Sequence, residues 1–294
     1  MALTSPALTL SVEALFGNIK PALDIIQLLG PTDFSAEAPG VDIKPGTTIK
    51  VPLSTVSAAA AFNETSNNYL TGGNTDWATL TAQHYLQGFD LKGTNIDQGV
   101  NAARVKQLFS KRCGTGISMA CVAAIKTALD ATTLSTAITL PASPAIADYD
   151  ALASAMDWYN GRDSVLCLSS TEYSKLKGVF HAAHLSAAPQ AMAEELGFKA
   201  VLLIPGLSAR AVIVPYGSLG FLARVPTLIA DYKEAGVETD PDSGLSVGIV
   251  VASEQSTNKL VVNGDIWFGC AAVSASANAT TTKGIIKVGT AAQS

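Results

Sequence analysis

Residues 46–89 read GTTIKVPLSTVSAAAAFNETSNNYLTGGNTDWATLTAQHYLQGF, and the order of patterns in this stretch decides the fold. The β-branched residues at 47–55 predict a strand. The polar residues at 63–76 predict a long, exposed tip. Residues 78–89 then alternate apolar and polar side chains, which predicts a strand that returns beside the first. The extended loop of this hairpin covers about 58–88, and because a projecting hairpin is marginal in water, we expect another surface to support it.

The segment before the hairpin, residues 1–45, is predicted to be an arm. Pro21 is expected to open a short helix over 22–29, and Gly30 is expected to end it. Further prolines and glycines follow, which is typical of an irregular segment. We therefore expect the arm to lie over another surface rather than to form a compact subdomain.

A long helix is predicted after the hairpin. Thr94 begins it, with Asp97 completing a weak capping box, and apolar residues continue at helical spacing. Gly114 and Gly116 are expected to break or kink it, so that 95–130 forms one broken helix or two helices in series. Basic side chains gather on its first half, at Arg104, Lys106, Lys111 and Arg112. We interpret them as a patch that faces a neighbouring subunit or DNA, with a solvated helix face as the alternative.

The second half of the chain predicts an α/β subdomain followed by closing strands. A helix over 148–160 leads to a continuously apolar strand at 164–168. Ser169 then caps a helix, and Glu172 completes its capping box. Acidic residues at 234–242 are expected to form a solvated loop. The remaining strands are predicted at 200–204, 211–214, 221–224, 245–252, 259–262 and 266–273.

The composition favours a protein that covers much of its surface with copies of itself. Apolar residues make up 48% of the 294 residues, and charged residues only 15%. A lone soluble domain needs a more charged surface, so we expect an oligomer, although a monomer with a surface rich in Ser, Thr and Asn stays open. The net charge of −5 argues against a dedicated nucleic-acid-binding protein. Four cysteines without a Cys-x-x-Cys pair predict buried free thiols in a reducing compartment.

No catalytic, cofactor-binding or metal site can be read from the sequence. Gly217-Ser218-Leu219-Gly220 has its serine one place too early for a nucleophile elbow, and Gly114-Thr115-Gly116 lacks the rest of a phosphate-binding loop. His181 and His184 could share a helix face, but no third ligand stands at a recognised spacing, so we interpret them as a surface pair. The start of the chain does not resemble a signal peptide, and no apolar run is long enough to span a bilayer. We therefore predict a protein that is not an enzyme, holds no cofactor and contacts no membrane.

The order of these elements resembles that of the major capsid proteins of tailed bacteriophages, the Hong Kong 97-like fold. The resemblance spans about 41–273. Five segments carry it: the strand at 46–53, the strand-to-helix step at 163–173, and the closing segments GFLARVP at 220–226, DPDSGLSVG at 240–248 and VNGDIWFG at 262–269. The resemblance implies an α+β fold with an N-terminal arm, an extended β-hairpin loop, a long spine helix, a peripheral domain and an α/β axial domain.

The resemblance also implies how the chain divides. Residues 1–45 would be the arm, and 46–92 the hairpin with its extended loop. Residues 93–146 would be the spine helix and peripheral domain, and 147–244 the axial domain. Residues 245–294 would hold the closing strands and a C-terminal tail.

The function implied by the resemblance is that of a head protein. Copies would assemble into the pentamers and hexamers of an icosahedral shell around double-stranded DNA, in the cytoplasm of a host bacterium, and would end in the virion. The implied partners are other copies, a separate scaffolding protein, a portal, decoration proteins, and packaged DNA through weak, non-specific contact. Loop contacts are expected from Phe62, Tyr69 and Trp77. No lysine lies between Phe62 and Asp90, so we expect no lysine-based covalent cross-link through this loop.

Three alternatives stay open on the sequence. The first is an encapsulin-type compartment with the same fold and an enzyme cargo. The second is another phage structural protein, such as a tail component. The third is a cytoplasmic α/β enzyme whose site residues do not follow a recognised motif.

Overall fold

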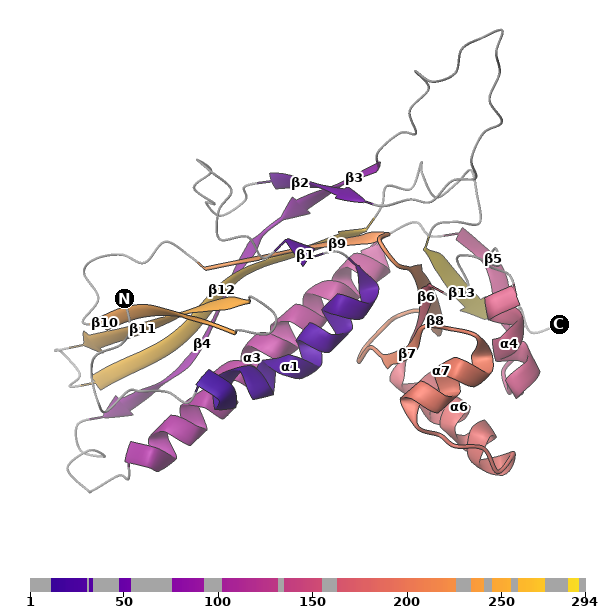
Figure 1. The fold of residues 1–294 in the computed structure, drawn as a ribbon, viewed down its shortest axis with the longest axis horizontal. Coiled ribbons are helices and arrows are strands. Elements are labelled where there is room, and N and C mark those ends of the chain that lie inside the picture. Colours follow the sequence, from indigo (N-terminus) through magenta and orange to yellow (C-terminus); the bar gives the residue numbers. More distant parts are fainter. Residues whose placement is uncertain are drawn as a thin grey trace, which may run out of the picture.

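The computed structural model describes residues 12–30, 32–33, 48–53, 76–92, 102–131, 135–154, 163–225, 234–240, 245–254, 259–272 and 285–290. Within these ranges the chain forms two sheets, a separate two-stranded hairpin, and helices packed against the sheets (Figure 1). The helices are α1 (Val12–Leu29), α3 (Ala102–Ala131), α4 (Ile146–Ser154), α6 (Ser170–Ala182) and α7 (Pro189–Leu196).

The larger sheet, named the β12 sheet, is organised around its longest strand. Its strands are β1 (Thr32–Asp33), β4 (Gln83–Lys92), β9 (Leu219–Arg224), β10 (Glu234–Thr239), β11 (Ser246–Glu254) and β12 (Lys259–Ala272). β4 pairs antiparallel with one side of β12, whereas β11 and then β9 pair antiparallel with its other side. Among the described residues β1, β4 and β10 each have a single pairing partner and are the outer strands.

Two sequence predictions about this sheet are wrong in detail. The closing segment from Lys259 is one continuous strand rather than two, because β4 pairs with it from Lys259 to Phe268, across the predicted gap, and β9 continues the pairing to Ala272. The first part of the acidic stretch expected to be a loop, Glu234–Thr239, forms strand β10, since it pairs with β11 along its whole length; residues 241–242 lie outside the described residues. The strand at 221–224 is confirmed as part of β9.

The helices α1 and α3 lie side by side along one face of the β12 sheet (Figure 1). α1 begins nine positions before the predicted Pro21 start, and Pro21 lies inside it. The helix continues across the proline because its apolar stripe, which includes Leu15, Ile19 and Ile26, is fully buried on both sides of that position. Pro21 and Gly17, one turn earlier, are both on the exposed side.

α3 is a single unbroken helix, so the predicted break at Gly114 and Gly116 is wrong. A Cβ atom on Gly114 would lie 2.6 Å from the carbonyl oxygen of Leu15 in α1, and one on Gly116 would meet the side chain of Gln87 in β4. These glycines therefore allow close packing of α3 against its neighbours. The predicted N-terminal start at Thr94 falls outside the described residues.

The smaller sheet, named the β6 sheet, has the order β5-β13-β8-β6-β7. Its strands are β5 (Ser135–Leu140), β6 (Ser164–Leu168), β7 (Ala200–Leu203), β8 (Ala211–Pro215) and β13 (Ile286–Thr290). The predicted strands at 164–168, 200–204 and 211–214 are confirmed. β6 is buried at every position and apolar after Ser164, because both of its faces are covered. Leu166 and Leu168 pack with α6 and α7, whereas Val165 and Cys167 join the core that contains α1 and α3.

The hairpin predicted from the opening stretch is half right: the first part of the returning strand pairs with the first strand, but residues 83–92 form β4, which pairs with β12 instead. β2 (Thr48–Leu53) pairs antiparallel with β3 (Asp76–Thr81), from Thr48↔Thr81 to Leu53↔Asp76. The chain then continues past Ala82 into β4. The range of 58–88 given for the extended loop is therefore too long at its end, because strand pairing begins at Asp76. Residues 54–75, between the two strands, lie outside the described residues.

The two sheets combine strands from distant parts of the chain. β9 and β10 belong to the β12 sheet, although the resemblance places them in the range 147–244. β5 and β13 belong to the β6 sheet, although they lie before and after that range. Pairing between strands far apart in sequence produces this difference, and no local pattern reports it.

Candidate functional site

The basic cluster predicted on the long helix lies on α3. Lys111 and Arg112 are exposed on its outer side, and neither forms an ion pair with another described residue. Arg104 and Lys106 belong to the first turns of the same helix, but their side chains are not among those described. The structure thus brings the four positions onto one helix. Whether they face a neighbour or DNA stays a prediction.

Of the three side chains expected to make loop contacts, only one has a described backbone. Trp77 lies in β3, opposite Pro52 of β2. Phe62 and Tyr69 lie outside the described residues. Contacts of these residues with another subunit stay predictions.

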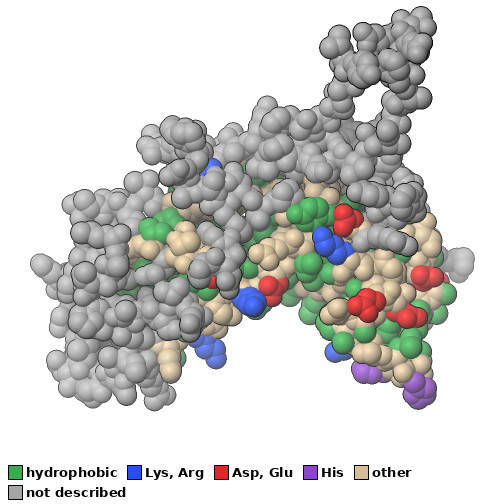
Figure 2. Space-filling model, viewed as in Figure 1, with side chains coloured by type: hydrophobic (Ala, Val, Ile, Leu, Met, Phe, Trp, Pro, Cys, Tyr) green, Lys and Arg blue, Asp and Glu red, His purple; other side chains and the backbone are tan. Residues whose placement is uncertain are grey.

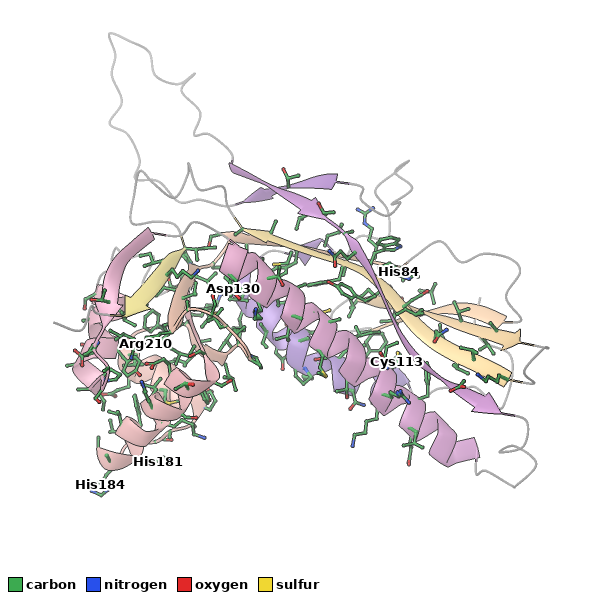
Figure 3. All side chains as sticks on the ribbon, turned by 180° about the vertical axis from the view of Figure 1, so that it is seen from behind. His84, Cys113, Asp130, His181, His184 and Arg210 are labelled. Atoms are coloured by element: carbon green, nitrogen blue, oxygen red, sulfur yellow. The ribbon has the colours of Figure 1, made fainter. Side chains whose placement is uncertain are left out.

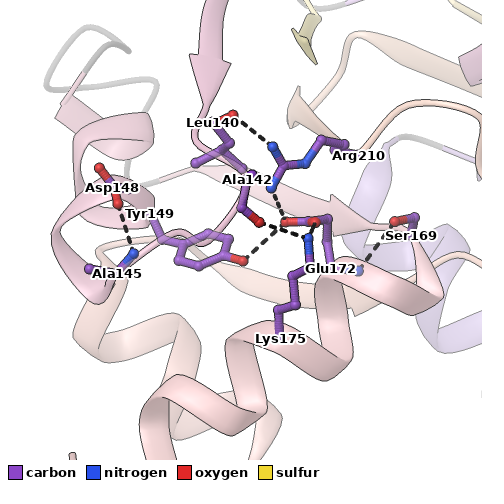
Figure 4. Close-up of polar contacts among 9 residues, drawn as sticks. All are labelled: Leu140, Ala142, Ala145, Asp148, Tyr149, Ser169, Glu172, Lys175 and Arg210. Carbon is purple, nitrogen blue, oxygen red and sulfur yellow. Dashed lines mark hydrogen bonds and ion pairs between the residues drawn. The ribbon is translucent and has the colours of Figure 1, made fainter. Parts of the chain in front are cut away.

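The β6 sheet and the helices α4, α6 and α7, which pack against it, are named the β6 sheet unit. A buried ion network joins the parts of this unit (Figure 4). Glu172, in the first turn of α6, is only 2% exposed. Its carboxylate accepts hydrogen bonds from Arg210 Nη2 at 2.8 Å, from Lys175 Nζ at 2.8 Å and from the Tyr149 hydroxyl at 3.2 Å. Arg210 also donates to the Leu140 carbonyl oxygen at 2.6 Å. The network therefore connects β5, α4, α6 and the start of β8.

The predicted capping box at Ser169 is half right. The Ser169 hydroxyl accepts from the Glu172 N–H at 3.4 Å, as predicted. The Glu172 side chain instead turns inward to the ion network, and Ser169 N–H donates to the Arg210 carbonyl oxygen at 3.0 Å. Burial alone would raise the pKa of the Glu172 carboxyl, but the hydrogen bonds and charges of Arg210 and Lys175 outweigh it and hold the pKa below its ordinary value.

A second polar link connects α3 to the loop between β7 and β8. Asp130 accepts hydrogen bonds from the backbone N–H of Ser208 at 3.0 Å and from its hydroxyl at 2.5 Å. Lys126, one turn earlier on α3, forms an ion pair with Asp130 at 2.7 Å. Burial opposes the charge on Asp130, but these partners hold the pKa of its carboxyl below the ordinary value. The C-terminal end of α3 is thereby attached to the β6 sheet unit.

The third polar cluster lies where β4 pairs with β12 (Figure 3). The His84 ring stacks on Trp267 with centroids 4.9 Å apart, and His84 Nε2 lies 3.5 Å from Asp265 Oδ2. Asp265 Oδ1 is buried and has no hydrogen-bond partner among the described residues. Burial raises the pKa of Asp265 despite the nearby imidazole. The Cys113 thiol lies near this carboxylate, but burial and the Asp265 charge raise its pKa to about 12, so it stays protonated and is a poor nucleophile.

His181, His184 and the cysteine thiols form no reactive site within the described residues. His181 is in the last turn of α6, while His184 lies beyond the helix in a left-handed conformation; both are exposed, and they do not share a helix face (Figure 3). No group of three metal-ligating side chains occurs in the described ranges. Burial raises the pKa of three thiols to about 12, at Cys113, Cys121 and Cys167. These thiols, and that of the partly exposed Cys270, are free, as predicted.

A hollow of about 400 Å³ lies between α3 and the β12 sheet. Ala123, Ala124 and Ala128 form its helix wall, and Tyr85 and Phe268 belong to its sheet wall. No charged side chain lines it. Its titratable groups are the Tyr85 hydroxyl and the Cys270 thiol, and burial raises the pKa of both, so neither is ionised near neutral pH.

Charge is distributed unevenly over the described surface, although α6 carries Lys175 and Lys177 beside the acidic residues of its unit. Acidic side chains gather on the unit that carries α4, α6 and α7 (Figure 2), and those on α4 and α7 include Asp150, Glu194 and Glu195. α3 carries no acidic residue before Asp130. No described helix is long and apolar enough to cross a membrane.

No protein-family model and no curated protein matches the chain. Solved structures do. The virus-like particle from Pyrococcus furiosus matches 94% of this chain and 96% of its own, with a TM-score of 0.53 and 9% identity. The capsid of Ralstonia phage GP4 matches 90% of this chain and 87% of its own, with a TM-score of 0.49 and 12% identity.

The capsid of an empty GTA particle matches 99% of this chain and 94% of its own, with a TM-score of 0.49 and 11% identity. At such identities the likeness concerns the fold. The assignment of the fold rests on the virus-like particle, because that match extends over almost the whole of both chains. The chain has the α+β, Hong Kong 97-like capsid fold that its sequence predicts.

Proposed function

We propose that this chain is the major capsid protein of a tailed bacteriophage. Copies would form the pentamers and hexamers of an icosahedral shell that encloses double-stranded DNA. The observation that carries the proposal is the match, over nearly the full length of both chains, to the subunit of a particle-forming protein. The sequence resemblance to tailed-phage capsid proteins supports DNA as the content.

The function of such a subunit is geometry rather than chemistry. Contacts in which each copy presents one face to a different face of the next close into rings when the rotation between copies fits. Many weak contacts per subunit then add up to a stable shell. Large apolar side chains left exposed on the described surface, including Leu86, Leu203 and Val237, are suited to such contacts.

The parts of the subunit would have different tasks. Residues 12–30 and 32–33 of the predicted arm instead belong to the subunit itself, because α1 packs against α3 and β1 pairs with β9. The loop that joins β2 to β3 would lie over neighbouring copies, with Phe62 and Tyr69 in contact and Trp77 at its base in β3. The axial range (147–244) would pack around the centre of each ring. Because no lysine lies between Phe62 and Asp90, the shell would be held without lysine cross-links through this loop. A ladder of covalent multimers on an SDS gel of assembled shells would contradict this.

The proposed partners follow from the same assignment. A separate scaffolding protein would guide assembly in the bacterial cytoplasm, and a portal and decoration proteins would complete the head. Contact with packaged DNA would be weak and non-specific, which agrees with the net charge of −5. The finished location would be the virion.

The test is to express the chain, size it and image it by negative-stain microscopy. Icosahedral particles, or free pentamers and hexamers, are expected. A protein that stays monomeric at high concentration would contradict the proposal. Particles purified from an infected host should contain nuclease-protected DNA; an enzyme cargo in place of DNA would instead identify an encapsulin-type compartment.

A further inference from the structure

We propose that the exposed side of α3 is a docking surface for an acidic, amphipathic helical segment of a second protein. The surface, named the α3 face, is made of Leu108, Lys111, Arg112, Thr115 and Met119. The proposal goes beyond shell assembly, because it concerns what else binds the subunit.

The first observation is a pair of apolar side chains in line along the helix. Leu108 is 56% exposed and Met119 is 68% exposed. They are three helical turns apart, about 16 Å along the axis and about 20° apart around it, so they point the same way. Thr115, which lies between them, is exposed and small enough to leave room for a partner side chain. This spacing fits the apolar positions along one face of a partner helix.

The second observation is unbalanced positive charge between these anchors. Lys111 and Arg112 are exposed and form no ion pair within the described residues. The only acidic residue of α3 is Asp130, at its far end, where Lys126 and Ser208 already bind it. A partner that brings carboxylates beside its apolar residues would complement both features of the α3 face.

The apolar anchors favour a protein over DNA. Phosphate groups would require Lys111 and Arg112 but would leave Leu108 and Met119 without a contact. Methionine is flexible and suits surfaces that accept varied apolar partners. Exposed apolar side chains between cations are therefore better matched by an amphipathic helix than by a nucleic-acid backbone.

A helix of a second copy is a poorer match. In such a copy, α7 carries two adjacent and exposed acidic residues, Glu194 and Glu195. The large apolar side chains of α7, Met192 and Leu196, are fully buried in the core of the β6 sheet unit. This helix therefore has no free apolar stripe to place against the α3 face.

The test measures binding of defined probes to the full chain by fluorescence anisotropy. The probes are a labelled helical peptide of about five turns with leucines along one face and glutamates elsewhere, a scrambled peptide of the same composition, and a short DNA duplex. One variant carries Leu108→Ala with Met119→Ala, and another carries Lys111→Ala with Arg112→Ala. The matched controls are Leu185→Ala and Lys20→Ala, which remove an exposed leucine and an exposed lysine elsewhere.

The helical peptide should bind more tightly than the scrambled one. Each double variant should weaken peptide binding about tenfold, whereas the controls should leave it unchanged. Circular dichroism and sizing of every variant separate lost binding from lost folding or lost assembly, so this result does not depend on whether shells form.

Three results would overturn the proposal. In the first, neither peptide binds the folded chain. In the second, DNA binds with the same dependence on Lys111 and Arg112 while loss of Leu108 and Met119 has no effect on any probe, which would identify a polyanion site. In the third, loss of Leu108 and Met119 abolishes self-assembly without changing peptide binding, which would make the α3 face a contact between copies.

Discussion

Replacing Glu172 by alanine tests whether the buried ion network holds the β6 sheet unit together. The Glu172 carboxylate is buried and binds Arg210, Lys175 and Tyr149. Removing it leaves the Arg210 guanidinium, whose side chain is only 15% exposed, without its anionic partner. The buried Tyr149 hydroxyl loses its acceptor as well.

The expected loss can be worked from this geometry. Removing one member of a buried ion pair costs about 3–5 kcal/mol, because the remaining charge stays buried without compensation. Arg210 keeps its hydrogen bond to the Leu140 carbonyl oxygen, so we expect Glu172→Ala to lie near the lower end, at about 3 kcal/mol. Lys175→Ala should cost less than about 1 kcal/mol, since the lysine side chain is 39% exposed and water screens its charge.

The assay is urea unfolding of the unassembled chain, followed by circular dichroism at pH 7 and at low pH. The pKa of Glu172 is lower in the folded chain than in the unfolded one, so its stabilisation is complete above about pH 4.3 and is lost as the pH falls through the folded value. The difference between wild type and Glu172→Ala should therefore shrink in acid. A Glu172→Ala variant no less stable than Lys175→Ala at pH 7 would show that the network does not stabilise the fold.

Three further perturbations test other parts of the structure. Gly114→Ala should destabilise the chain by about 1–3 kcal/mol in urea unfolding, because its Cβ would press on the backbone of α1. Gly178→Ala, on the open side of α6, is the control and should be neutral or stabilising. Equal effects of the two substitutions would contradict the packing of α1 on α3. Asp265→Asn should flatten the pH dependence of the free energy of unfolding. The pKa of Asp265 is raised in the folded chain, so its contribution to stability is full below about pH 4 and is lost as the pH rises through the pKa of the folded state. An unchanged pH profile would show that the carboxylate beside His84 is not buried. At the three buried cysteines, Cys113, Cys121 and Cys167, a thiol reagent should modify the native chain far more slowly than the unfolded chain. Mass spectrometry measures both rates, and equal rates would contradict the burial of these thiols.

The sequence was informative where one residue's neighbours in the chain are also its neighbours in space. The strands at 47–55 and 164–168 follow from β-branched or continuous apolar residues, and the Ser169 cap from its spacing to Glu172. The hairpin follows from two such strands in succession.

The errors arose where a distant segment decides the structure. Gly114 resembles a helix breaker until α1 is seen to pack against it, and Pro21 resembles a helix start until the buried stripe of α1 is seen to continue on both sides. The partners of Glu172 and Asp265 could not be predicted, because Arg210 and His84 are joined to them only by tertiary packing and sheet pairing. Lys111 and Arg112 were found from sequence because they are adjacent, but Leu108 and Met119 were not singled out, because their exposure depends on which neighbours cover each side of α3.

The measurement that bears most directly on the proposed function is electron cryo-microscopy of the purified, expressed chain. We expect a closed icosahedral particle whose density holds this fold in rings of five and six copies. A homogeneous population of monomers, or of small open oligomers under every assembly condition tried with and without a scaffolding protein, would contradict the proposal that the chain is a shell subunit.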